Sequence, residues 1–182
     1  MIDPGDKGDC AIAAQRMPAL PERFTPLPRR REGFCFGCGP DNKAGLGMQF
    51  FADGNSVVSQ VAVPDHLCGW GRVVHGGIIT TMLDEVMGWT AIHLLRHLVL
   101  TKSLQVQFEK PLFAGQMLWL AGRVVEKTSE REALVSAELF NPAGERCATS
   151  QGVFALFTGD AAKKLGFLDP DLVDEISALF PR

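Results

Sequence analysis

The order of apolar and polar positions predicts two strands followed by one long helix. Residues 47–51 and 56–63 alternate as strands do, and Asp53-Gly54-Asn55 between them suits a tight hairpin turn. From about Gly76 to Leu95 the apolar residues instead recur with the period of a helix, so we expect one half of that helix to face a sheet. The residues of this half are Ile78, Ile79, Met82, Leu83, Val86, Met87, Trp89, Thr90 and Leu94.

Four more segments with strand character follow the helix, and turn residues separate them. The segments are 98–108, 117–127, 133–140 and 148–157. Short connections imply that successive strands pair antiparallel. After them, Asp169 and Pro170 suit a helix N-cap and first turn, which predicts a short C-terminal helix. One long helix against a six-stranded antiparallel sheet is an α+β arrangement. The apolar face of the C-terminal helix is Leu172, Val173, Ile176, Leu179 and Phe180.

The first 33 residues differ in composition and are expected to form an N-terminal arm. They contain five prolines, which oppose regular structure, and include the basic run Arg29-Arg30-Arg31. Three charges are a weak signal for phosphate binding, so we interpret the run as part of a solvated arm. The predicted organisation is an extension over 1–33, a domain over 34–158 and a tail helix within 159–182.

Length, charge and cysteine content limit the class of protein. With 182 residues and 46% hydrophobic content, the chain can form one domain with a substantial core. A net charge of -3 disfavours a broad nucleic-acid surface, and no apolar run has the length of a membrane span. The N-terminus lacks the pattern of a secretory signal, and five cysteines, an odd number, fit reduced thiols. These features predict a cytoplasmic protein without nucleic-acid or membrane partners.

The other arc of the long helix has small residues around a single carboxylate, Asp84. A face that meets only water more often has Lys, Glu and Gln, so this arc indicates the close approach of another helix or of a ligand. We expect the adjacent Glu85 to be an ordinary solvated carboxylate. The residues of the arc are Gly77, Thr80, Thr81, Asp84, Gly88 and Ala91.

The start of this helix also has an unusual composition. His75-Gly76-Gly77 precedes the apolar run without Ser, Thr, Asp or Asn at the cap position. Two glycines let a ligand approach the backbone, and the first N–H groups of a helix are free at the positive end of its dipole. The segment therefore predicts an anion site or an oxyanion hole.

Three segments resemble the hotdog-fold acyl-CoA thioesterases of the phenylacetate-pathway and hydroxybenzoyl-CoA thioesterase type. They begin Phe34-Cys-Phe-Gly-Cys-Gly, Val74-His-Gly-Gly-Ile-Ile and Thr101-Lys-Ser-Leu-Gln-Val, and the resemblance covers 34–157. It implies a hotdog fold, in which the antiparallel sheet wraps around the long helix. In this family an Asp or Glu nine residues after the His is catalytic, which implies that role for Asp84.

The spacing along the helix predicts a site shared between two chains. Nine residues of helical rise place Asp84 about 13 Å beyond His75, too far for Asp84 to act with the Gly76 amide of its own chain. A two-fold dimer with antiparallel helices brings Asp84 of one chain to Gly76 of the other. The resemblance likewise implies a homodimer, or a dimer of dimers.

The predicted reaction is hydrolysis of an acyl-CoA with an aryl or medium-chain acyl group. Gly76, together with Gly77, binds the oxyanion, and Asp84 attacks the carbonyl carbon or activates a water, two roles that the sequence leaves open. Thr101 holds the water or the carboxylate, and His75 shapes the turn. No metal or organic cofactor is predicted, since CoA is part of the substrate.

Two features of the sequence complicate this prediction. Some relatives have Asn or Gln six residues before the His, whereas this chain has Gly69 and lacks a side-chain donor there. Cys35-x-x-Cys38 has the spacing of half a zinc site, with His66 and Cys68 as the nearest further ligands. We interpret this pair as a packed, metal-free turn.

Two other functions remain as alternatives. A hotdog-fold dehydratase or hydratase would use His75 as an acid or base on carbon. A non-catalytic acyl-CoA-binding module would gain nothing from Asp84, because a carboxylate repels the ligand's phosphates. Release of a thiol from a panel of acyl-CoAs distinguishes these functions.

Overall fold

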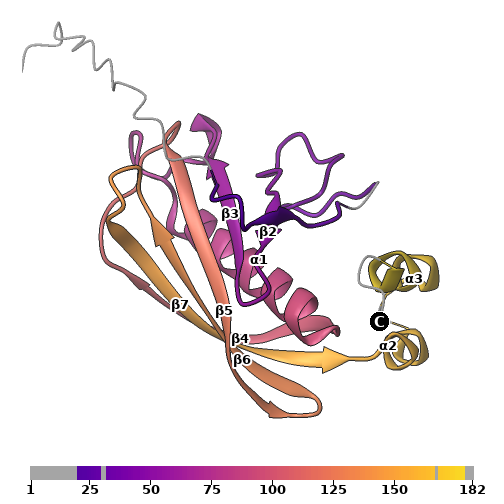
Figure 1. The fold of residues 1–182 in the computed structure, drawn as a ribbon. Coiled ribbons are helices and arrows are strands. Elements are labelled where there is room, and N and C mark those ends of the chain that lie inside the picture. Colours follow the sequence, from indigo (N-terminus) through magenta and orange to yellow (C-terminus); the bar gives the residue numbers. More distant parts are fainter. Residues whose placement is uncertain (1–19, 30–31, 167, 179–182) are drawn as a thin grey trace, which may run out of the picture.

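The computed structural model describes residues 20–29, 32–166 and 168–178, and its main body is one curved sheet around one helix (Figure 1). The helix is α1, Gly76–Leu95, with the bounds expected from the sequence. The predicted arm up to residue 19, Arg30 and Arg31 lie outside the described residues, as do Leu179 and Phe180. The strands are β1 (Thr25–Pro26), β2 (Phe50–Ala52), β3 (Val57–Ala62), β4 (Leu98–Phe108), β5 (Met117–Ser129), β6 (Glu132–Phe140) and β7 (Arg146–Phe157).

The sheet has the order β1-β2-β3-β5-β6-β7-β4, and each neighbouring pair is antiparallel. This confirms the predicted α+β class and the antiparallel sheet. The number of strands differs, because the two-residue β1 adds a seventh strand to the six expected. Such a short strand has no alternation to detect. It is held by pairing with β2 and by the buried side chains of Phe24 and Leu27.

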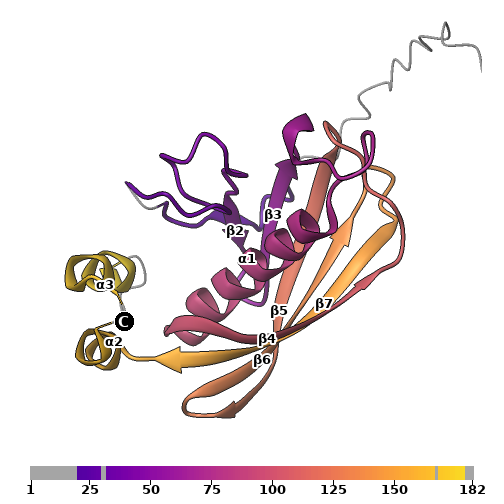
Figure 2. The same ribbon diagram turned by 180° about the vertical axis from the view of Figure 1, so that it is seen from behind.

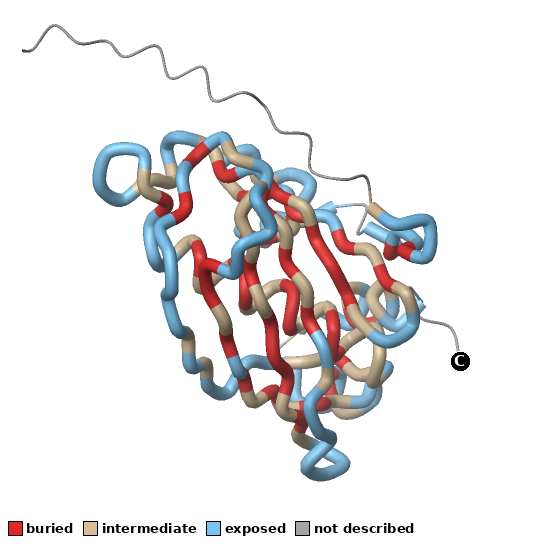
Figure 3. Tube along the Cα trace, turned by 60° about the vertical axis from the view of Figure 1, so that its left-hand side comes forward, coloured by how far each residue is buried: buried red, intermediate tan, exposed pale blue. Residues whose placement is uncertain are grey.

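One side of α1 packs into the concave face of the sheet. Helix and sheet approach closely at Gly122 of β5, where an added Cβ would lie 2.3 Å from Thr90 Oγ1. Buried positions follow the central strands, while exposed positions gather in the connecting loops (Figure 3). The predicted core face of α1 is largely confirmed, but Ala91, expected on the outer arc, is fully buried, and Trp89 and Leu94 are only partly buried.

The C-terminal region contains two helices where one was expected. The predicted helix is α3, Pro170–Ala178, and α2, Gly159–Leu165, precedes it with Thr158 as N-cap. Ala162 and Val173 form a small second core with Leu98 at the start of β4. Both helices therefore lie beside the C-terminal end of α1 (Figure 2). The division at residues 33 and 158 remains a prediction. Within the described part of the chain, no helix is long and apolar enough to cross a membrane.

Candidate functional site

A cavity of about 220 Å³ lies beside the middle of α1. Its polar wall brings together Asp84 and Glu85 of α1, Thr101 of β4 and the two cysteines of the loop before β2. The other lining residues are Gly88, Trp89, Ile92, Val99, Phe154 and Ile176. A hollow of about 270 Å³, lined by residues such as Gln105, Arg123 and Gln151, lies over β4–β7. We place the candidate site at the first cavity, because two partly buried carboxyl groups face apolar side chains there.

Asp84 and Thr101 form a direct pair in this cavity. Thr101 Oγ1 donates a hydrogen bond of 2.8 Å to Asp84 Oδ1. The β4–β7 register shifts between Thr101 and Ser103, and such an irregularity re-aims a side chain on a strand. Burial raises the pKa of Asp84, and the negative charge of Cys35 adds to this rise, while the Thr101 hydrogen bond opposes it. The structure therefore brings together two of the five predicted site residues.

The other three residues lie at the exposed start of α1. His75 is the N-cap, and its Nδ1 accepts a hydrogen bond of 3.0 Å from the Gly77 N–H. The expectation of an uncapped helix with two free glycine amides is therefore wrong. An imidazole nitrogen can accept the bond that Ser or Asp accepts in most N-caps, a role that residue preferences do not reveal.

Within the described part of the chain, the backbone N–H of Gly76 is free, as the sequence predicted. Its N–H is at the first position of α1, and within the described ranges it has no hydrogen-bond acceptor. An added Cβ would meet only Phe108, at 3.7 Å, so the backbone here is open to an approaching group. Eight residues of helical rise separate this amide from Asp84 by about 12 Å. One chain therefore presents the amide and the carboxylate at separate places.

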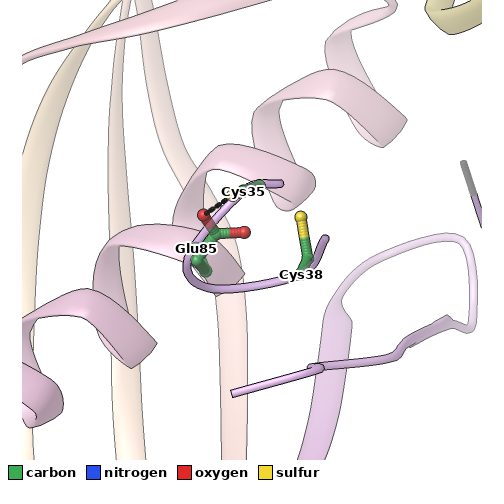
Figure 4. A group of neighbouring side chains, drawn as sticks. All are labelled: Cys35, Cys38 and Glu85. Atoms are coloured by element: carbon green, nitrogen blue, oxygen red, sulfur yellow. Dashed lines mark hydrogen bonds between the residues drawn. The ribbon is translucent and has the colours of Figure 1, made fainter. Parts of the chain in front are cut away.

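Glu85 differs most from its predicted surroundings. It is not solvated, because the loop from Cys35 to Cys38 crosses α1 over it (Figure 4). An added Cβ at Gly37 would lie 2.2 Å from Glu85 Cγ, so only glycine permits this contact. Cys35 Sγ and Glu85 Oε1 are 3.2 Å apart. The loop is 50 residues away in the sequence, and no local pattern indicates that it covers this helix position.

The protonation states of this cluster depend on one another. Hydrogen bonding from the Cys38 thiol lowers the pKa of Cys35, and the same interaction raises that of Cys38. Burial, and then the negative charge of Cys35, raise the pKa of Glu85 to about 8. Cys35 and Glu85 therefore share one proton across the 3.2 Å contact, and the lowered pKa of Cys35 together with the raised pKa of Glu85 shifts that proton toward the carboxyl group.

Two glycines that the sequence singled out have specific neighbours. Gly69 lies beside His75, where an added Cβ would be 3.5 Å from the ring carbon Cδ2. Gly88 was expected on an arc that another helix or a ligand approaches closely. In the structure it lines the cavity, where an added Cβ would contact Phe154 and Val99 of the same chain. A larger residue at position 88 would therefore fill the cavity.

Comparison with known families agrees with this architecture. A family model described as Thioesterase superfamily matches residues 71–148, which include His75, Gly76, Asp84 and Thr101. The superfamily resemblance expected from the sequence is thus confirmed. No curated protein matches the chain.

Solved structures show the same fold. A thioesterase superfamily protein has a TM-score of 0.61 at 22% identity, and the match covers 67% of this chain but 60% of that one. A Streptococcus mutans protein, solved bound to acetyl CoA, has a TM-score of 0.53 at 20% identity over 56% of this chain and 81% of its own. The E. coli PaaI protein, from the phenylacetic acid degradation operon, has a TM-score of 0.56 at 18% identity over 62% of this chain and 81% of its own. The hotdog fold is therefore confirmed, while identities this low do not establish activity or substrate.

Proposed function

We propose that this protein hydrolyses the thioester bond of an acyl-CoA, with Asp84 as the catalytic carboxylate. The observation that carries the proposal is the hydrogen-bonded pair of Asp84 and Thr101 in a cavity with apolar walls. Water attacks the thioester carbonyl carbon, the bond from carbon to sulfur breaks, and the products are a carboxylic acid and the CoA thiol. Asp84 either takes the proton of that water or attacks the carbonyl carbon itself, and in the second case water then hydrolyses the anhydride.

The oxyanion of this reaction needs a hydrogen-bond donor, and the Gly76 N–H is the candidate. Its amide has no acceptor among the described residues, and it lies at the positive end of the α1 dipole. Because Asp84 is about 12 Å from this amide in the same helix, the donor must belong to another copy of the chain. We therefore propose a homodimer, alone or within a dimer of dimers, in which two α1 helices lie antiparallel.

Apolar residues of the cavity suit the acyl group of the substrate. Trp89, Ile92, Val99 and Phe154 surround the space next to the carboxylate, and they suit an aryl or a medium-chain acyl group. One similar structure was solved bound to acetyl CoA and another with coenzyme A, which supports a CoA thioester as the substrate class. The hydrolysis described here requires no organic cofactor and no metal at Asp84.

A panel of acyl-CoAs tests the proposal. Aryl, short, medium and long acyl-CoAs are offered to the full chain, and thiol release is followed with a chromogenic disulfide while binding is measured in parallel. Turnover that disappears in Asp84→Asn supports the proposal. Tight binding without turnover would instead support a binding module, and loss of a double bond at carbon would support a hydratase. Light scattering at micromolar concentration measures the assembly, and an active monomer would refute the shared site.

A further inference from the structure

The loop before β2 presents two sulfur atoms to the side of α1. Its turn from Cys35 to Gly39 is closed by the Gly39 N–H, which donates a hydrogen bond of 2.9 Å to the Cys35 carbonyl. Gly37 and Gly39 are both buried, and a Cβ at Gly39 would lie 2.4 Å from the Cys35 nitrogen. A side chain at Gly39 would open the turn, and a side chain at Gly37 would displace Glu85. The two glycines therefore keep both cysteines on the same side of a tight loop, directly above Glu85.

Neighbouring groups of this turn favour the charged form of the Cys35 sulfur. Hydrogen bonding from the Cys38 side chain, and then from the backbone N–H groups of Cys38 and Gly37, lowers the pKa of the Cys35 thiol. Amide hydrogens that converge on sulfur stabilise a thiolate, which is the form of cysteine that binds metals. This turn is thus arranged for a negatively charged ligand atom before any cation arrives.

Three donor atoms converge at this place. Sulfur atoms of Cys35 and Cys38 and a carboxylate oxygen of Glu85 all lie within 4.8 Å of one another. The corresponding distances in a tetrahedral zinc site are roughly 3.5 to 3.8 Å, as follows from zinc–sulfur and zinc–oxygen bonds of about 2.3 and 2.0 Å. The Cys35–Glu85 distance of 3.2 Å would open slightly and the longest distance would contract by up to about 1 Å, changes that side-chain rotation can supply.

The cluster has no cation of its own. In the described part of the chain, no Lys, Arg or His forms an ion pair with Glu85. Two thiols and a carboxyl group that are partly buried together are costly in their charged forms unless a positive charge is added. A divalent cation supplies that charge and uses all three donor atoms at once.

We propose that Cys35, Cys38 and Glu85 bind one zinc-class divalent cation. Two thiolates and one carboxylate select a borderline-soft metal over magnesium or calcium, which prefer sites made of oxygen alone. All three residues line the cavity that contains Asp84, so the fourth coordination position opens into that cavity for a water or another small ligand. The site is independent of the proposed hydrolysis, in which the metal takes no part.

Metal stoichiometry tests the site without any assay of activity. Full-length protein is stripped with a chelator under a thiol-free reductant and titrated with zinc against a chromophoric competitor. We expect one zinc per chain, with a dissociation constant below about 1 µM. Cobalt in place of zinc should give the thiolate-to-cobalt charge-transfer absorption that requires cysteine ligands.

Variants separate ligation from folding. Cys35→Ser and Cys38→Ser should each weaken zinc binding by at least about 100-fold, and Glu85→Gln by about 10-fold to 100-fold. Gly37→Ala retains all three donors but should also weaken binding, because its Cβ would displace Glu85 from under the loop. The matched control is Cys68→Ser, which removes a thiol outside the cluster and should leave binding unchanged. Circular dichroism of each apo-variant checks that it is folded.

Several results would overturn the proposal. One is zinc binding in the original protein that is weaker than about 10 µM or below half a metal per chain. Another is binding that survives Cys35→Ser, or that Cys68→Ser removes equally. A third is a Cys35–Cys38 disulfide that persists under the reductant and excludes zinc, which would make the pair a redox centre. None of these results depends on thioester hydrolysis, so the two proposals can fail separately.

Discussion

Asp84 and Glu85 are adjacent carboxyl groups of α1, but they lie against two different walls of the same cavity. On the β4 wall, Asp84 accepts a hydrogen bond from Thr101. On the loop wall, Glu85 lies beneath Cys35 and Cys38, and its nearest polar neighbour is a sulfur atom. Burial raises the pKa of both groups, but Glu85 is raised to about 8, while the hydroxyl of Thr101 opposes the rise at Asp84.

This difference shows how one turn of helix can contain two chemical functions. A carboxylate that accepts a hydrogen bond retains its charge and can serve as a base or a nucleophile. A carboxyl group beside a thiolate retains its proton unless a cation replaces that proton. Asp84 and Glu85 are both carboxylic acids at successive positions of one helix. The residues that surround each group, and not the helix, therefore determine its chemical function.

The largest effect is expected from removing the charge at the β4 wall. Asp84→Asn should lower turnover by at least about 100-fold, because general-base or nucleophilic catalysis is lost, while acyl-CoA binding is nearly retained. Glu85→Gln is the matched substitution on the other wall and should lower turnover far less. Thiol release and calorimetric binding measure both effects. Near-normal turnover of Asp84→Asn would remove this residue from the mechanism.

A slightly smaller effect is expected at the backbone donor, which lies outside both walls. Gly76→Ala should reduce turnover by about 100-fold if the amide binds the oxyanion, since one such donor is typically worth that much. The fold should tolerate it, because the nearest side-chain atom to the new Cβ is 3.7 Å away.

His75 provides the control for that prediction. His75→Ala removes the cap on the Gly77 N–H and should cost about 1 kcal/mol of stability, with a smaller loss of turnover than Gly76→Ala. His75→Asn restores an N-cap acceptor and should recover most of both. An inactive His75→Asn that is fully folded would make His75 an acid–base group and favour the hydratase alternative.

The third effect is a shift of the pH profile. Thr101→Val removes the donor that opposes the raised pKa of Asp84, so that pKa should rise further. Because Asp84 acts as the carboxylate, activity is lost as pH falls through its pKa, and the acid limb of kcat/KM should move upward. A hydrogen bond to a charged group is worth about 1.5 to 3 kcal/mol, and water replaces part of it, so the upward shift should be measurable. Thr149→Val on β7 is the control and should leave the limb in place.

The smallest effect is on stability, at the loop wall. In metal-free protein, the pKa of Glu85 is raised to about 8 and the pKa of its partner Cys35 is lowered to about 4. Between these values the native pair and the unfolded pair each bind one proton, so the two shifts offset each other and stability changes little with pH. Glu85→Gln removes the carboxyl group and leaves the lowered pKa of Cys35, so stability of this variant should rise as pH rises from about 5 to about 8. Urea unfolding in the presence of a chelator measures this, and Glu126→Gln, at an exposed position of β5, should behave like the original protein. A pH dependence in Glu85→Gln that equals that of the original protein would contradict the paired shifts.

Periodic and local features of the protein could be predicted from its sequence. The helix over 76–95 and the strand over 98–108 were predicted with the observed bounds, because apolar periodicity and flanking turn residues are local properties. Asp84 also stood out locally, as a carboxylate among small residues on the outer arc of a helix. The two-residue β1 and the helix α2 were missed, since the first has no period and the second is only seven residues long.

Tertiary structure alone decided which side chains meet across the chain. In the sequence, Glu85 has the features of an exposed helix residue, but in the structure a loop 50 positions earlier covers it. Gly88 faces Phe154 because β7 passes that point of the helix. His75 became a cap because the turn brought its Nδ1 to the Gly77 N–H. A hydrogen bond, a burial cost or a metal site depends on distances of a few ångströms between residues far apart in sequence. The local sequence pattern therefore determined most of the helices and strands and identified Asp84 as a candidate catalytic residue. The packing of the Cys35–Cys38 loop and of β4 on α1 determined the chemical surroundings of Asp84 and Glu85.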